Sequence, residues 1–130
     1  MLVVIDTNIL VSSLMSPFGA PAKLMGLVIQ GSVTPCFDYR IMIEYREVLS
    51  RPKFGFTNDE INALLGGIQI NGMSVLAEPL DIPFTDESDK KFYEVAKFCR
   101  ATLITGNIRH FPKDSRVTDV RSFLGRFRIL

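Results

Sequence analysis

The chain has 130 residues, of which 47% are hydrophobic and 22% charged, and its formal net charge at pH 7 is +1. This composition is typical of a globular protein and excludes disordered and fibrous classes. The near-zero net charge argues against a protein that holds nucleic acid by bulk charge alone, although a local basic patch remains compatible with it. We expect one domain over residues 1–130.

Two further features bear on the cellular compartment. No stretch approaches the roughly 20 apolar residues of a membrane span, and the N-terminus lacks the basic and apolar segments of a signal peptide. Cys36 and Cys99 fit no metal or redox spacing, so we interpret both as buried thiols in a reducing compartment. The expected location is the cytoplasm, without membrane association.

The first element is a short β-branched run, residues 2–5, which predicts a buried strand. Asp6, Thr7 and Asn8 follow it directly. These are ordinary turn or cap residues, and Asp6 or Thr7 would cap a helix over residues 7–14. In an open parallel sheet, however, ligands bind just outside the carboxyl ends of the strands. Asp6 is therefore a candidate for a cap and also for a functional site.

The next elements are a helix over residues 22–29, a strand over 32–37 and a helix over 39–50. Asp38 is placed to cap the last of these helices. Glu44 lies at the edge of its apolar stripe, whereas Glu47 lies further out, as an outer acid of a site or a surface residue. A carboxylate at the boundary of the core needs a partner, so Glu44 is the second candidate site residue.

The following segments are a helix over residues 58–72 that frays near two glycines or continues to its end, a strand over 73–77, a loop over 78–85, and a helix to residue 99. Thr57 and Glu60 have the spacing of a capping box. Asp86 and Asp89 stand at the head of the last helix, where acids complement the helix dipole. Asp89 is also in line with the apolar face of that helix, which directs it toward the core. Asp86 is either a helix cap or a residue of the metal site.

A fourth strand, over residues 101–105, ends like the first in polar residues, here Thr105 and Asn107. A short strand over 117–120 and a tail of undetermined structure over 122–130 complete the chain. The alternation of strands and helices predicts an α/β fold, a three-layer α/β/α sandwich around a mainly parallel sheet of four or five strands.

In that fold we expect four oxygen-bearing side chains to lie at one crevice. Two of them follow the strands over 2–5 and 101–105, and two belong to the helices that carry Glu44 and Asp89. The four are Asp6, Glu44, Asp89 and Asn107. Hard oxygen ligands of this kind suit Mg²⁺ or Mn²⁺, which keep several waters and bind phosphates through few carboxylates. The absence of cysteine or paired histidine from the set disfavours zinc.

Four sequence blocks in this order resemble a PIN domain, most closely the small prokaryotic PIN proteins classed as toxin components of toxin–antitoxin systems (VapC-like). The blocks are VIDTN at 4–8, IEYREVLSRPKF at 43–54, SDKKFYEVA at 88–96 and TGNIRHF at 105–111. The resemblance extends over residues 2–112. Four blocks in the right order are far more specific than any single motif.

The resemblance implies a metal-dependent ribonuclease. By position, Asp6, Glu44 and Asp89 would bind one or two Mg²⁺ or Mn²⁺ ions, and Asn8 would orient the site. The family often has an aspartate where this chain has Asn107, which removes one charge and weakens the case for a second metal. The resemblance also implies a cognate antitoxin protein and a homodimer.

The same chemistry follows from the reaction itself, because a carboxylate-bound divalent metal supplies both the nucleophile and the charge stabilisation that phosphodiester cleavage needs. A basic C-terminal segment could bind the phosphates of RNA, or form a solvated rim; its basic residues are Arg109, Lys113, Arg116, Arg121, Arg126 and Arg128. Thr105 and Arg109 are expected beside the site or substrate. His110 is either a general acid or a structural or phosphate-contacting residue.

We therefore expect an endoribonuclease that acts as the toxin of a type II pair. Two alternatives remain open. One is a PIN-like module of weak activity that works by binding RNA or protein, which Asn107 favours. The other is a nuclease of the same fold acting on DNA.

Overall fold

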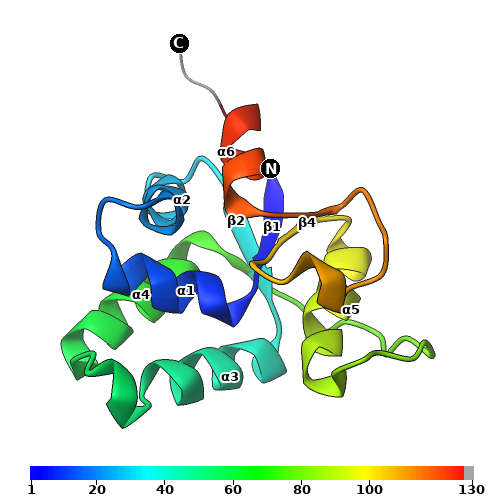
Figure 1. The fold of residues 1–130 in the computed structure, drawn as a ribbon, viewed down its shortest axis with the longest axis horizontal. Coiled ribbons are helices and arrows are strands. Elements are labelled where there is room, and N and C mark those ends of the chain that lie inside the picture. The colour runs from blue at the N-terminus through cyan, green and yellow to red at the C-terminus, as the bar shows by residue number, and fades with distance from the viewer. Residues whose placement is uncertain (128–130) are drawn as a thin grey trace.

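The computed structural model describes residues 1–127 (Figure 1). Its strands are β1 (Leu2–Ile5), β2 (Thr34–Phe37), β3 (Met73–Ser74), β4 (Thr102–Ile104) and β5 (Val117–Thr118). Its helices are α1 (Thr7–Met15), α2 (Ala20–Ile29), α3 (Tyr39–Leu49), α4 (Asn58–Asn71), α5 (Lys90–Cys99) and α6 (Val120–Arg126), with single turns η1 (Pro52–Phe54), η2 (Glu87–Asp89) and η3 (Ile108–His110).

The five strands form one sheet in the order β3-β2-β1-β4-β5, and every pair is parallel. Helices α1, α2 and α4 lie on one side of the sheet and α5 lies on the other (Figure 1). The predicted three-layer α/β/α sandwich is confirmed, with a sheet that is parallel throughout.

The centre of the sheet explains where a site can form. Val3, Val4 and Ile5 of β1 have no exposed surface, as expected for a central parallel strand covered on both faces. Since β1 pairs with β4, the carboxyl ends of these strands meet, and the Asp6 amide donates to the Ile104 carbonyl at 2.9 Å. The residues that follow the two strands are thereby brought together.

Local signals fix several helix ends. Asp38 caps α3 by accepting from the Ile41 amide at 3.0 Å, and both hydrogen bonds of the Thr57–Glu60 capping box are present at the start of α4. Helix α4 continues through its two internal glycines and ends before Gly72. A Cβ at Gly72 would lie 2.3 Å from the Ile68 carbonyl oxygen, so only glycine fits there.

The C-terminal part differs from the prediction. The strand predicted over 117–120 is shorter, because the Asp119 carboxylate accepts from the Ser122 amide at 2.7 Å and starts α6. The tail predicted over 122–130 is therefore partly helical, and residues 128–130 lie outside the described residues. Strand β3 is likewise shorter than predicted, with two residues.

The cysteines are both free, and the prediction that both are buried is right for Cys36 and wrong for Cys99, which is half-buried. Burial and the neighbouring Cys99 raise the pKa of the Cys36 thiol to about 12. In the part of the chain that the structure describes, no helix combines the length and apolar character needed to cross a membrane.

Candidate metal centre

Asp6 is a buried carboxylate at the carboxyl end of β1. It is 6% exposed, its Oδ1 accepts from the Thr7 amide at 2.8 Å, and its Oδ2 accepts from the Thr105 hydroxyl at 2.7 Å. Burial raises the pKa of Asp6 from its ordinary 3.8 to about 6, and the charges of Asp89 and Glu44 add to the rise against these two hydrogen bonds. Asp6 is thus both the helix cap and an acid held in an unfavourable ionised state.

Glu44 projects from α3 toward Asp6. Its Oε2 accepts from the Thr7 hydroxyl, and its Oε1 lies 2.7 Å from the ammonium nitrogen of Lys91. The prediction that a carboxylate at this boundary needs a partner is confirmed, and the main partner is a lysine of α5.

Asp89 closes η2 immediately before α5, and its side chain is 18% exposed. Its Oδ2 lies 3.2 Å from Nδ1 of His110. Burial raises the pKa of Asp89 above its ordinary value, and the charges of Asp86 and Glu44 add to the shift, whereas His110 opposes it. The sole histidine of the chain therefore contacts a candidate metal ligand.

Asn8 carries an unused acceptor. Its Oδ1 is buried and has no hydrogen-bond partner among residues 1–127. On the other side of the amide, a Cβ built on Gly106 would lie 3.3 Å from Nδ2. A buried carbonyl oxygen without a donor costs free energy unless a ligand or water satisfies it. Asn8 thus has one acceptor free next to Asp6 in the chain, and its amide lies where a side chain at position 106 would contact it.

Thr105 and Asn107 follow β4. Thr105 is fully buried, and its hydroxyl also accepts from the Asn107 amide at 2.9 Å. One threonine therefore links the Asp6 carboxylate to the loop that carries Asn107.

These groups surround an open cavity of about 340 Å³. Its polar lining includes Asp6, Asn8, Asp89 and Asn107, and its apolar wall includes Val48 and Phe54. Glu44 and Thr105 contact lining residues but do not themselves line the cavity. The structure brings the predicted residues from both strand ends and from the head of α5 to one place.

Three predicted residues lie further out. The exposed Asp86 accepts from the Ser88 amide and hydroxyl at 2.9 and 2.7 Å, and these bonds lower its pKa, so it acts as a cap. Glu47 pairs with Arg51 on the exposed face of α3. Arg109 is exposed in η3 and does not line the cavity.

Within residues 1–127, no three Asp, Glu, His or Cys side chains stand together as a ready-made metal site. The contacts explain this finding, since each candidate acid is turned toward a partner of its own. Asp6 faces Thr105, Glu44 faces Lys91, and Asp89 faces His110.

Comparisons with known proteins show the family to which the chain is related. The family model described as PIN domain matches residues 2–109, which is most of the chain. The chain belongs to the PIN domain family. It is also 31% identical over 109 residues to "Uncharacterized protein MJ1680" of Methanocaldococcus jannaschii, covering 81% of this chain and 70% of that protein. No solved structure matches.

PIN domains have a nuclease fold and are generally metal-dependent. The side chains of this PIN domain fit a hard divalent cation in three respects. Asp6 is an acid that burial and neighbouring acids make costly to ionise, Asn8 has a buried acceptor without a partner, and the set offers only oxygen ligands. An ion would have to draw the acids away from the partners they hold here.

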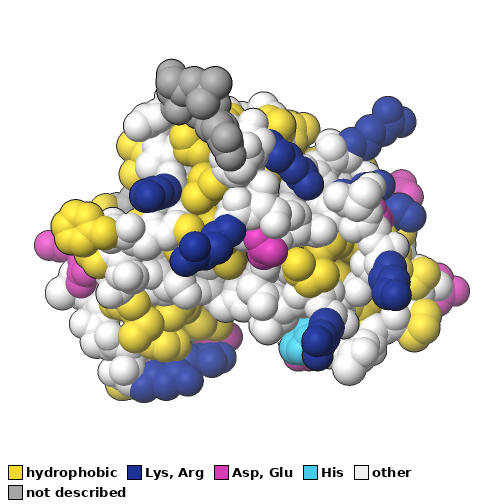
Figure 2. Space-filling model, turned by 45° about the horizontal axis from the view of Figure 1, so that its top comes forward, with side chains coloured by type: hydrophobic (Ala, Val, Ile, Leu, Met, Phe, Trp, Pro, Cys, Tyr) yellow, Lys and Arg dark blue, Asp and Glu magenta, His cyan; other side chains and the backbone are white. Residues whose placement is uncertain are grey.

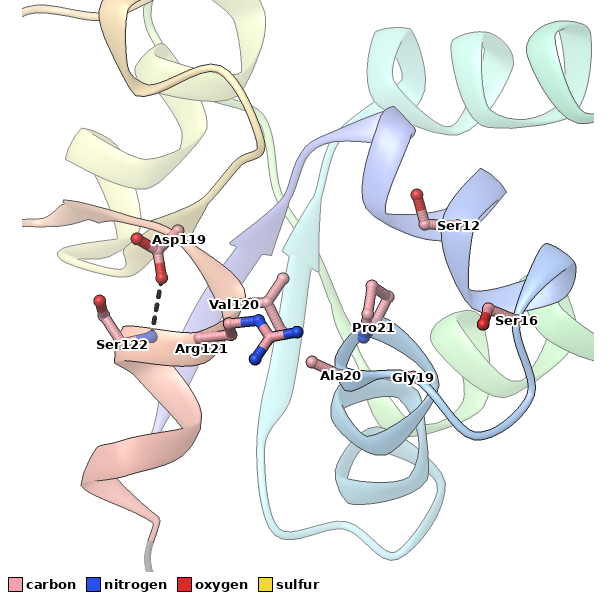
Figure 3. Close-up of a pocket in the computed structure, with 9 residues that line it drawn as sticks. All are labelled: Ser12, Ser16, Gly19, Ala20, Pro21, Asp119, Val120, Arg121 and Ser122. Carbon is pink, nitrogen blue, oxygen red and sulfur yellow. Dashed lines mark hydrogen bonds between the residues drawn. The ribbon is translucent and has the colours of Figure 1, made fainter.

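A second cavity of this PIN domain, of about 470 Å³, lies between the α1–α2 connection and the start of α6 (Figure 3). Ser12 lines both cavities, and the Arg121 side chain extends toward Ala20 and Pro21.

The basic residues of the C-terminal segment differ in their surroundings. Arg121 borders the second cavity, whereas Arg116 forms an ion pair with Asp114. Figure 2 shows Lys and Arg side chains in separate places across one face, without a continuous stripe.

Two important residues were not predicted. One is Lys91, and its signal was a lysine in the first turn of a helix, where a positive charge opposes the helix dipole. The other is Glu94, a buried acid that binds Arg40 and the Leu80 amide, both at 2.7 Å. Nothing local in the sequence distinguishes Glu94 from a surface helix residue.

Proposed function

We propose that this PIN domain is an endoribonuclease that depends on Mg²⁺ or Mn²⁺ and hydrolyses phosphodiester bonds in RNA. The observation that carries the proposal is Asp6, a carboxylate whose pKa burial raises to about 6, with a smaller contribution from the nearby acids Asp89 and Glu44, together with the unpartnered Asn8 acceptor. Such a cluster gains from a cation.

Asp6 and Asp89 would hold the ion, with Glu44 as the third acid and Asn107 at the edge of the cavity. A divalent ion supplies an activated water at neutral pH and charge for the phosphoryl oxygens. Thr105 and the Thr7 amide orient Asp6, while Asn8 presents its free acceptor. The apolar wall of Val48 and Phe54 borders the same cavity.

RNA is the proposed substrate because of the resemblance of the four sequence blocks, and two arginines near the cavities would bind its phosphates. Arg109 follows Asn107 closely in the chain, and Arg121 borders the second cavity, which shares Ser12 with the first. A strand that passes from one cavity to the other would exchange counterions for these arginines.

The test is cleavage of RNA by the wild type and by Asp6→Asn, each with Mn²⁺ or with EDTA. We expect cleavage by the wild type with Mn²⁺ and none by the variant. Equal activity in both proteins, or none in either, would overturn the assignment. Parallel reactions with single-stranded and duplex DNA separate a DNA-directed nuclease from a ribonuclease.

We also propose, from the resemblance of the four sequence blocks, that the chain is the toxin of a type II pair, restrained by an antitoxin and active as a homodimer in the cytoplasm. Induced expression should then arrest growth, and Asp6→Asn should abolish the arrest. A PIN domain that only binds RNA is the second candidate, favoured by the neutral Asn107. It predicts RNA binding that Asp6→Asn preserves, without cleavage by either protein.

A further inference from the structure

Lys91 is a half-buried lysine that pairs with Glu44, one of the acids of the candidate centre. It lies in the first turn of α5, its side chain is 14% exposed, and its ammonium nitrogen is 2.7 Å from Glu44 Oε1. The ammonium also donates to the Ser88 carbonyl and lies 5.2 Å from the centroid of the Phe92 ring. Three separate contacts therefore fix the position of this charge.

A positive charge at this position is unfavourable unless nearby acids compensate for it. A lysine in the first turn of a helix is repelled by the helix dipole, and an ammonium removed from water needs a counter-charge. Glu44 supplies that counter-charge. Asp89, another member of the centre, is two residues before Lys91 in the chain.

The lysine also determines what Glu44 can do. Both Glu44 oxygens are engaged, Oε1 with Lys91 and Oε2 with the Thr7 hydroxyl. This accounts for the finding that Glu44 does not line the cavity although its charge reaches Asp6. The cavity itself presents Asp6 and Asp89 to a ligand.

The charges of the centre then balance with a single ion. Asp6, Glu44 and Asp89 carry three negative charges when ionised, and Lys91 offsets one of them. Asn107 contributes none. The two negative charges that remain match one divalent cation.

We propose that the Lys91 ammonium, paired with Glu44, takes the place of a second divalent ion, so that the centre binds one divalent ion. The inference rests on the proposed function only in requiring that the centre binds a divalent ion at all. Lys91 is then a residue that positions Glu44 and sets the metal stoichiometry.

The experiment is a calorimetric titration of the full chain with Mn²⁺, comparing the wild type with Lys91→Gln. Glutamine removes the charge but keeps an N–H donor for Glu44. The matched control is Lys90→Gln, because Lys90 is the adjacent lysine of the same turn, 18% exposed, and lies 3.9 Å from the exposed Glu87. Lys91→Arg restores the charge.

We expect one Mn²⁺ per chain for the wild type, Lys90→Gln and Lys91→Arg. Lys91→Gln should bind a second equivalent or bind the first at least about tenfold more tightly, since the positive charge that is paired with Glu44 has been removed and the centre is more negative by one charge. Lys91→Met, titrated in the same way, replaces Lys91→Gln if circular dichroism shows that the glutamine variant is unfolded.

The outcomes separate the two proposals. If Lys91→Gln matches the wild type in stoichiometry and affinity, or binds more weakly, the role of Lys91 is overturned while the metal centre stands. Two Mn²⁺ ions per wild-type chain would have the same meaning. If the wild type binds no Mn²⁺, the metal centre fails, and the role of Lys91 fails with it.

Discussion

The Thr105 hydroxyl donates to Asp6 Oδ2 at 2.7 Å across 99 residues of sequence, and both side chains are buried. This bond joins the ends of neighbouring strands β1 and β4. It stabilises the ionised carboxylate, yet burial and the two nearby acids outweigh it, and the pKa of Asp6 stays near 6. In the metal-free protein the ionised Asp6 carboxylate therefore lowers the free energy of unfolding.

That cost predicts that the Asp6→Asn variant is more stable than the wild type, by an amount that depends on pH. The folded-state pKa of about 6 exceeds the ordinary 3.8. Between these values the folded protein binds more protons than the unfolded chain, so the contribution of Asp6 to stability falls as pH rises and reaches its full cost above pH 6. After allowance for a weakened Thr105 hydrogen bond, we expect Asp6→Asn to be more stable by about 2 kcal/mol in neutral solution.

Urea unfolding in EDTA over a range of pH measures this effect. The difference between the wild type and Asp6→Asn should shrink as the pH falls toward the ordinary value of 3.8. A difference that is constant with pH, or a variant that is less stable at neutral pH, would contradict the raised pKa.

Divalent ions should stabilise the wild type. An ion that binds the folded state alone at about 100 times its dissociation constant adds about 2.7 kcal/mol. We expect a rise of several degrees in the Tm of the wild type in Mn²⁺ or Mg²⁺ and little or no rise for Asp6→Asn. Differential scanning calorimetry with and without EDTA measures it. Equal shifts in both proteins would show that the ion binds elsewhere.

The sequence predicted what local patterns determine. The run at 2–5 predicts a central strand, the Thr57 capping box predicts a helix start, and Asp6 at a strand end predicts a site. It could not predict that Glu44 pairs with Lys91, because the two lie on different helices and meet only through tertiary packing. The same reason hides the contact of Asp89 with His110.

Gly106→Ala should disturb the centre without unfolding the protein. The added Cβ would lie 3.3 Å from Asn8 Nδ2, so the Asn8 amide must shift by a few tenths of an ångström. We expect weaker Mn²⁺ binding by several-fold and lower cleavage, with a change in unfolding free energy of less than about 1 kcal/mol. Calorimetric titration and urea unfolding measure the two effects.

Gly66→Ala is the control for that substitution. A Cβ at Gly66 meets nothing within 4 Å in the interior of α4, so alanine should stabilise the helix by up to about 1 kcal/mol and leave Mn²⁺ binding unchanged. If both alanine variants bind Mn²⁺ like the wild type, the position of the Asn8 amide does not matter for the ion.

Glu94→Gln tests a buried ion pair that supports the fold outside the metal centre. The Glu94 side chain is 4% exposed and holds Arg40 and the Leu80 amide, which attaches the loop after β3 to α5. Since Arg40 is 44% exposed and keeps its ion pair with Asp38 at 2.7 Å, we expect a loss of about 2 kcal/mol, below that of a fully buried pair. The matched control is Glu47→Gln, which breaks the exposed pair with Arg51 and should cost less than about 1 kcal/mol. Urea unfolding measures both, and Mn²⁺ titration should show unchanged binding in each variant. Equal losses would mean that the Glu94 pair supports the loop no more than a surface pair does.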